Sequence, residues 1–184
     1  MIRNRTVFLR AWIVLTFSWV VLSAHAKTEP GDLLDAARQS GHFDVYIKAL
    51  AKTGMVAEME GDGPFTIFAP TDEAFARMPE GKREVLFSPE HVADLRKLLR
   101  YHIVPGRIPQ DEADVVGHVQ ALTQQFYIKR QDGQLMANDA KVVVPAKHTS
   151  NGILYGIDRV LIPHYQNLFL PGPPNKTSND RSSR

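Results

Sequence analysis

The sequence predicts an α+β fold in which helices come first and most strands follow. Capped and amphipathic helical segments occupy the chain up to about residue 102, apart from one apolar strand-like run at residues 65–69. Beyond them, β-branched and aromatic segments separated by turn signals continue to residue 163. Helices followed by strands are typical of α+β folds, whereas regular alternation would predict a parallel α/β sheet. We therefore expect one domain with its helices gathered in the N-terminal half.

The first 26 residues have the three parts of a secretory signal peptide. Arg3, Arg5 and Arg10 make a basic start, residues 11–23 form an apolar run of 13 residues, and Ala24-His25-Ala26 supplies small residues at a cleavage site. A spanning helix needs about 20 apolar residues, so an uncleaved membrane anchor is the less favoured interpretation. Cleavage there leaves 158 residues, enough for a single domain.

Charge and cysteine content narrow the possible function classes. The whole chain has 22 Lys and Arg against 20 Asp and Glu, and removal of three arginines with residues 1–26 leaves 19 against 20, a net charge of −1. No basic block tracks a phosphate backbone, which argues against nucleic-acid binding. The chain has no cysteine, which excludes disulfides, a lipoprotein anchor and cysteine zinc sites. We expect an exported domain, periplasmic or extracellular and of bacterial type.

Three helical segments are predicted before the first strand. Asp32 can cap a first helix. Residues 43–52 repeat apolar side chains at spacings of four and three, as one face of an amphipathic helix does, and Gly54 can end that helix. Residues 55–59 can add a helical turn, and residues 61–64 then form a turn of the chain.

A strand, a corner and a helix are predicted over residues 65–75. Residues 65–69 are typical of a buried strand, which Pro70 ends because proline lacks the N–H that a ladder needs. Thr71 can cap the following helix. Asp72 and Glu73 fall in its first turn, where the helix dipole favours carboxylates. We interpret this junction as a structural corner.

A last helix is predicted from the segment Ser88-Pro89-Glu90, with Ser88 as its cap and proline at its first position. Its apolar stripe leads to His102, and Pro105-Gly106 breaks the chain. Strands follow. Residues 126–130 and 135–138 form a predicted hairpin around the turn Asp132-Gly133, and residues 141–145 are β-branched.

The last predicted strand covers residues 153–162, with Gly152 and Gly156 as bends or bulges. After Pro163 a few apolar residues can pack back on the domain. Residues 171–184 are rich in proline and polar residues and predict a disordered tail. Asn175 begins a glycosylation sequon within that tail.

Three segments carry a resemblance to a known family. They are FTIFAPTDEAF at residues 65–75, LLRYHIVPG at residues 98–106 and NGILYGIDRVLIP at residues 151–163. In order and spacing they resemble the fasciclin domain, over residues 31–163. The resemblance implies a fasciclin-type β-sandwich wedge decorated by helices, and it implies adhesion or matrix contact rather than catalysis.

Two positions carry the family's adhesive interpretation. In the fasciclin family a Tyr-His segment with branched aliphatic flanks is linked to integrin-dependent adhesion, and this chain has Tyr101 and His102 in that setting. Such flanks are also typical of a core segment, so we favour a buried, hydrogen-bonded His102, with Thr71 or Asp72 as hypothetical partners. Asp158 is a weaker candidate for adhesive contact.

Catalytic and metal sites find little support. The six histidines outside the predicted signal peptide show no i, i+2 or i, i+4 pair, so the sequence has no local zinc motif. The acidic residues Asp111, Glu112 and Asp114 lack the spacing of a calcium loop. The chain has no G-x-S-x-G elbow. We expect no enzyme activity, no catalytic residues, no cofactor and no metal.

The sequence thus predicts a secreted or periplasmic, non-enzymatic module for cell adhesion or surface contact. Its partner would be a cell-surface or matrix protein or glycan, with no nucleic acid and no transmembrane segment left after signal cleavage. The alternative is a periplasmic binding module for a small apolar ligand. A deep apolar pocket with a few polar groups would favour that alternative, and a shallow exposed patch would favour adhesion.

Export gives a direct prediction about the N-terminus. We expect mass spectrometry of protein isolated from its native host to find Lys27 as the first residue, because Ala24-His25-Ala26 supplies the cleavage site. Recovery of folded protein with intact Met1 in a membrane fraction would contradict this prediction.

Overall fold

A computed structural model describes residues 31–113 and 117–163, so the predicted signal peptide and the predicted C-terminal tail lie outside the described residues. The helices are α1 (Leu33–Ser40), α2 (Asp44–Lys52), α3 (Val56–Glu60), α4 (Asp72–Ala76), α5 (Glu80–Leu86) and α6 (Val92–Tyr101), with a 3-10 turn η1 (Pro89–His91) before α6. The strands are β1 (Phe65–Pro70), β2 (Ile103–Pro105), β3 (His118–Gln120), β4 (Gln125–Gln131), β5 (Gln134–Ala137), β6 (Ala140–Thr149) and β7 (Gly152–Ile157).

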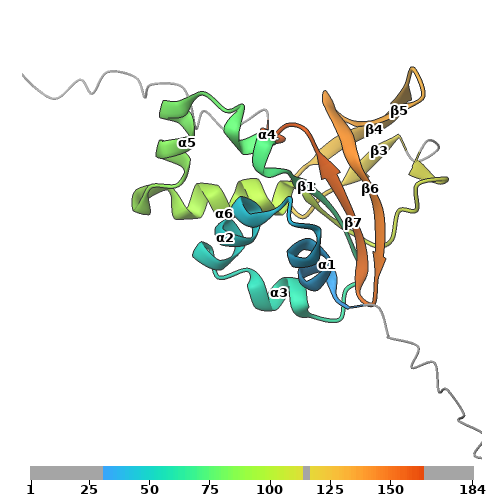
Figure 1. Cartoon of the computed structure of the whole chain (residues 1–184), viewed down its shortest axis with the longest axis horizontal. Helices are drawn as coiled ribbons and strands as arrows, with labels where there is room; N and C mark the ends of the chain where they lie inside the picture. Colours follow the sequence, from blue (N-terminus) through green and yellow to red (C-terminus); the bar gives the residue numbers. More distant parts are fainter. Residues whose placement is uncertain (1–30, 114–116, 164–184) are drawn as a thin grey trace, which may run out of the picture.

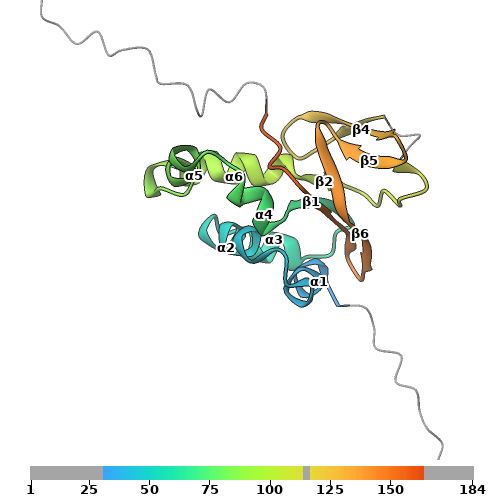
Figure 2. The same ribbon diagram turned by 45° about the horizontal axis from the view of Figure 1, so that its top comes forward.

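The strands form one seven-stranded sheet in the order β2-β1-β7-β6-β5-β4-β3. Only β1 and β7 pair in parallel, and the other neighbours are antiparallel. The sheet curls so that its two ends approach, and the Leu122 N–H donates to the Ile103 carbonyl at 2.9 Å. Figures 1 and 2 show the helices gathered on one side of the molecule and β3 to β6 on the other. The predicted α+β, sandwich-like wedge is confirmed.

Strand β1 lies between two apolar cores, which explains its unbroken run of apolar residues. Ile67 and Ala69 pack into a core built mainly by the helices. Phe68 points the other way, into the core enclosed by the curled sheet, because successive strand residues face opposite sides. There Phe68 stacks on Tyr155 with 5.0 Å between ring centroids and meets the edge of Phe126 at 5.4 Å. Both faces of this strand are therefore fixed by packing.

The helix starts confirm two predicted caps and correct a third. The Asp32 carboxylate accepts the Asp35 N–H at 2.8 Å and begins α1. The Thr71 hydroxyl accepts the Ala74 N–H at 3.2 Å and begins α4. Ser88 occupies the predicted N-cap position before Pro89, but it makes no capping bond to a backbone N–H, and its hydroxyl lies 2.9 Å from the ring of His91 instead.

The C-terminal half keeps the predicted hairpin and shortens one strand. Asp132 and Gly133 have φ angles of 52° and 77°, the left-handed pair that a tight two-residue turn requires. Strand β6 extends beyond the predicted residues 141–145, to Thr149. Strand β7 stops at Ile157 rather than at residue 162. Beyond Ile157 the chain leaves the sheet, and the backbone N–H of Leu161 donates to Nε2 of His102 instead of to a neighbouring strand. The prediction of a strand over 153–162 is therefore wrong beyond Ile157.

Gly152 and Gly156 of β7 let neighbouring strands approach closely. The extra residues that shift the register between β6 and β7 lie on β6. The shifts occur on β6, between Val142 and Val144 and between Val144 and Lys147. A Cβ at Gly156 would lie 2.5 Å from the Cβ of Val144. A Cβ at Gly152 would lie 2.1 Å from the carbonyl oxygen of Phe65. Both shifts flank the Val144–Gly156 pair, so the predicted irregularity is present at Gly156 with its extra residues on β6, whereas the predicted bulge at Gly152 is wrong, because Gly152 pairs regularly with Thr149.

Gly152 provides a test of this packing. We expect Gly152→Ala to lower the free energy of unfolding by about 1–3 kcal/mol or more, because the new Cβ would push apart the backbones of β1 and β7. Gly81→Ala is the matched control, since a Cβ at that position in α5 meets nothing within 4 Å. This control should be neutral or stabilising by up to about 1 kcal/mol. Equal urea midpoints for Gly152→Ala and the wild type would contradict the prediction.

Candidate functional site

His102 joins the three motif segments from inside the fold. The residue follows the last turn of α6 and is fully buried. Its Nδ1 lies 2.8 Å from the Leu98 carbonyl, and its Nε2 accepts the Leu161 N–H at 2.9 Å. Its own carbonyl accepts the Phe68 N–H at 2.9 Å. One residue therefore connects α6, β1 and the chain that leaves β7.

These two hydrogen bonds determine which nitrogen of the His102 ring carries the proton. Because Nε2 accepts a backbone N–H, it carries no proton, and Nδ1 is the nitrogen that donates, to the Leu98 carbonyl. Burial lowers the pKa of His102 from its ordinary 6.5 to about 4, and the bond to Leu98 opposes that shift only in part. The imidazole is therefore neutral at physiological pH.

The predicted burial of His102 is confirmed, and the partners predicted for it are wrong. Both ring nitrogens are bonded to backbone groups, at Leu98 and Leu161, so Thr71 and Asp72 are not its partners. Tyr101 is also buried, at 1% exposure. Its hydroxyl donates to the Gln125 carbonyl at 3.3 Å and accepts from the Asn138 amide at 3.2 Å. Neither ring is presented to solvent.

The side chains of Thr71 and Asp72 bond to backbone N–H groups at the starts of two different helices, α4 and α2. Thr71 caps α4. The pKa of the Glu73 carboxyl is lowered, first by a hydrogen bond from the Glu73 backbone N–H and second by one from the Thr71 hydroxyl. Asp72 reaches across to α2, where its two oxygens accept the N–H groups of Val45 at 2.7 Å and Asp44 at 3.3 Å. These bonds satisfy donors that the start of α2 would otherwise leave free.

Asp158 holds the end of β7 in place. Its carboxylate accepts the Lys141 N–H at 2.7 Å and lies 3.7 Å from Arg77, which also donates to the Asp158 carbonyl at 3.1 Å. The side chain is only 17% exposed. Thr71 and Asp158 line the same open depression, next to Arg77. The structure thus brings these two predicted residues together, and neither Tyr101 nor His102 is among the residues that line it.

Asn151, the first residue of the third motif segment, is a structural residue. Its Oδ1 accepts the Leu33 N–H at 2.9 Å. Its Nδ2 donates to the carbonyls of Met59 at 2.8 Å and Gly61 at 2.9 Å. This amide therefore ties α1 and α3 to the start of β7. No local pattern could have revealed contacts over 90 residues or more.

Two surface features bear on ligand binding. An apolar depression of about 390 Å³ lies among α2, α4 and α5, and Val45, Phe75 and Phe87 contribute apolar side chains to its lining. It is open to solvent, and Asp72, which also lines it, has both carboxylate oxygens in hydrogen bonds to α2. Within residues 31–113 and 117–163, no group of three or more His, Asp or Glu residues is arranged to hold a metal ion.

None of the helices in the described part of the chain is both long and apolar enough to cross a membrane.

The curled sheet, its helical cover and the buried histidine between them define a helix-decorated β-wedge domain. The chain belongs to the fasciclin family, whose profile, described as "Fasciclin domain", matches residues 41–163. The family resemblance predicted from the three motif segments is confirmed.

Relatives of known sequence and structure agree with this assignment. The chain is 34% identical over 144 residues to protein sll1483 of Synechocystis sp., which covers 78% of this chain and 79% of that protein. It is 36% identical over 110 residues to transforming growth factor-beta-induced protein ig-h3 of Oryctolagus cuniculus, covering 56% of this chain and 16% of that protein. A FAS1 domain pair from the insect cell adhesion molecule fasciclin I matches the fold with a TM-score of 0.66 at 13% identity, over 73% of this chain and 52% of that one.

The buried state of His102 predicts a pH-dependent stability. In the unfolded chain the imidazole takes up a proton near pH 6.5, whereas the folded chain resists protonation down to about pH 4. The unfolded state therefore binds more protons between these values, and the free energy of unfolding should fall as pH is lowered from about 6.5 to about 4. Urea titrations across this range measure the slope.

Two variants isolate the contribution of His102. His102→Ala should lose about 1–3 kcal/mol at pH 7, because Leu98 and Leu161 keep unpaired backbone groups, and its stability should vary less between pH 6.5 and 4 than that of the wild type. His148→Ala, at an exposed position on β6, should keep the wild-type slope. Weaker surface attachment by His102→Ala with unchanged stability would instead identify the Tyr101-His102 segment as a contact site.

Proposed function

We propose that this chain is an exported, non-enzymatic module that mediates adhesion or surface contact by binding a cell-surface or matrix protein or glycan. Membership of the fasciclin family carries the proposal, since the matched region covers most of the described residues. The similarity to a domain pair from a protein described as a cell adhesion molecule supports it further. Export is supported by the signal-peptide pattern of residues 1–26.

The burial of the motif residues directs attention to the rest of the surface. Tyr101 and His102 are in the core, and Asp158 is occupied by Lys141 and Arg77. A partner must therefore contact side chains outside the three motif segments or at their solvent-facing ends. Within the described part of the chain, the exposed large apolar residues are Val85, Tyr127, Val143 and Ile162, with 37–52% of their surface accessible.

Binding of a small apolar ligand is the second candidate function, and one observation favours it. The depression beside Phe75 and Phe87 has an apolar lining and the volume of a small ligand site. Such sites normally enclose most of their ligand, whereas this one is open and the carboxylate of Asp72 is already bonded to α2. Surface contact with a larger partner therefore remains the stronger proposal.

An attachment assay tests the adhesive function. We expect beads that carry the full chain to attach to cells or isolated cell-envelope material of the native host more than albumin-coated beads do. Soluble full chain added in excess should compete for the same partner and reduce attachment. Attachment equal to that of albumin beads, or attachment that soluble chain does not reduce, would contradict the proposal.

A further inference from the structure

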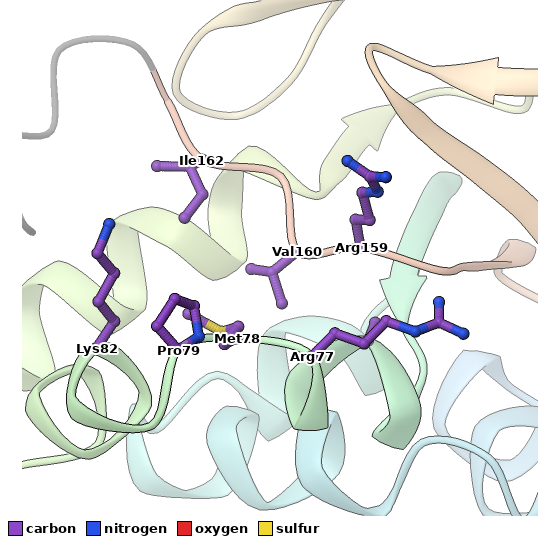
Figure 3. A pocket seen from close by; sticks show the side chains of 8 residues that line it. Arg77, Met78, Pro79, Lys82, Arg159, Val160 and Ile162 are labelled. Atoms are coloured by element: carbon purple, nitrogen blue, oxygen red, sulfur yellow. The ribbon is translucent and has the colours of Figure 1, made fainter.

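A second depression lies between the α4–α5 segment and the chain that follows β7. Its volume is about 370 Å³, and Figure 3 shows the side chains that line it. Met78 comes from the connection between α4 and α5, while Val160 and Ile162 come from the segment after β7. These aliphatic side chains form the middle of the depression. We call it the α4–α5 groove.

Cationic side chains flank this apolar middle. Lys82 stands at one end of the α4–α5 groove, and Arg77 and Arg159 stand at the other end (Figure 3). No carboxylate is among the described residues that line it. The mature chain as a whole is close to neutral by sequence, so this concentration of positive charge is a local feature of the fold.

The two arginines are held differently, because Arg77 also donates to the carbonyl of the mostly buried Asp158, whereas Arg159 makes one exposed ion pair. Arg77 lies 3.7 Å from the carboxylate of Asp158, and its side chain is 62% exposed. Arg159 lies 3.3 Å from Asp139, with side chains that are 60% and 76% exposed. Ion pairs at such exposure contribute little, because water competes for both charges. A partner's carboxylate can therefore contact the Arg159 guanidinium at small cost.

Apolar surface near the groove adds a place for an anchoring side chain. Ile162 is 37% exposed, and Val85, three residues after Lys82 on α5, is 41% exposed. Residues three apart on a helix lie on the same side of it. Exposed aliphatic surface beside charges of one sign is typical of a site for a partner that combines apolar and charged groups.

We propose that the α4–α5 groove binds an acidic peptide segment of a partner protein, with an aliphatic side chain over Met78, Val160 and Ile162 and carboxylates at both ends. Charge complementarity carries this inference. The inference rests on the proposed function, and it names a partner class for the adhesive contact.

The lining of the groove separates this occupant from other anionic ligands. A fatty acid has one carboxylate, which could contact the cations at only one of the two ends. An acidic sugar offers charge, but the described lining contains no aromatic ring on which a sugar could stack. A peptide with acidic residues on both sides of an aliphatic one matches the arrangement of charge and apolar surface.

Fluorescence anisotropy with a labelled Glu-Glu-Leu-Glu-Glu peptide tests the inference on the full chain. Changing Lys82→Glu together with Arg159→Glu should weaken binding at least about tenfold, because both ends of the groove then repel the peptide. Arg77 is left in place, since it contacts Asp158. The control variant Lys129→Glu with Lys147→Glu makes the same change of net charge at exposed positions on β4 and β6 and should bind like the wild type.

Two further peptides test the apolar and the charged parts of the site. Glu-Glu-Ser-Glu-Glu should bind at least about threefold more weakly because it lacks the aliphatic anchor, and Gln-Gln-Leu-Gln-Gln should lose binding. Equal weakening in the control variant, or equal affinity for the serine peptide, would overturn the inference. Competition by an oligouronate or a fatty acid, but not by unlabelled leucine peptide, would also overturn it.

The bead assay distinguishes the failure of this inference from the failure of the proposed function. If wild-type beads attach and beads with Lys82→Glu and Arg159→Glu attach equally well, the groove is not the contact site, and the adhesive function stands. If wild-type beads fail to attach, the proposed function fails whatever the peptide result.

Discussion

The fold depends on one buried imidazole that meets three separate parts of the chain. His102 is fully buried, donates to the Leu98 carbonyl behind it in α6, and accepts the Leu161 N–H from the segment after β7. Its carbonyl accepts the Phe68 N–H of β1. A neutral histidine provides one donor and one acceptor on a rigid ring. Few other side chains could satisfy both backbone groups in the same space.

The residues by which the family is recognised therefore build the scaffold. The side chains of Thr71 and Asp72 cap the starts of α4 and α2. Asp158 bonds the end of β7 to β6, and Tyr101 and His102 lie in the core. Buried polar groups must find partners, which ties these residue types to their positions. A sequence resemblance carried by such residues identifies the fold and says little about where a partner binds.

Partner binding therefore depends on surface features that form only when the chain folds. The α4–α5 groove joins a helix connection near residue 80 to a segment near residue 160, and its three cations come from two distant parts of the chain. In the sequence these basic residues are surrounded by acidic ones, and no basic block appears. The local positive charge exists only because the chain after β7 lies beside α4 and α5 (Figure 3).

Local patterns in the sequence determined much of this structure. The caps at Asp32 and Thr71 and the turn at Asp132-Gly133 follow from interactions within a few residues, so the sequence alone predicts them. The apolar run of β1 was also visible in the sequence, because both faces of that strand are buried. The order of helices and strands predicted the α+β class, and the family motifs predicted the wedge through resemblance. The short strands β2 and β3 lack a periodic signal of their own, because pairing with distant partners creates them.

Tertiary structure alone decided the long-range contacts. The end of β7 at Ile157, the partners of His102, the role of Asn151 and the α4–α5 groove all depend on residues dozens of positions apart. No spacing rule links such residues. The physical reason is that side-chain chemistry shows what bonds a residue can make, whereas only the folded chain brings a particular partner within reach.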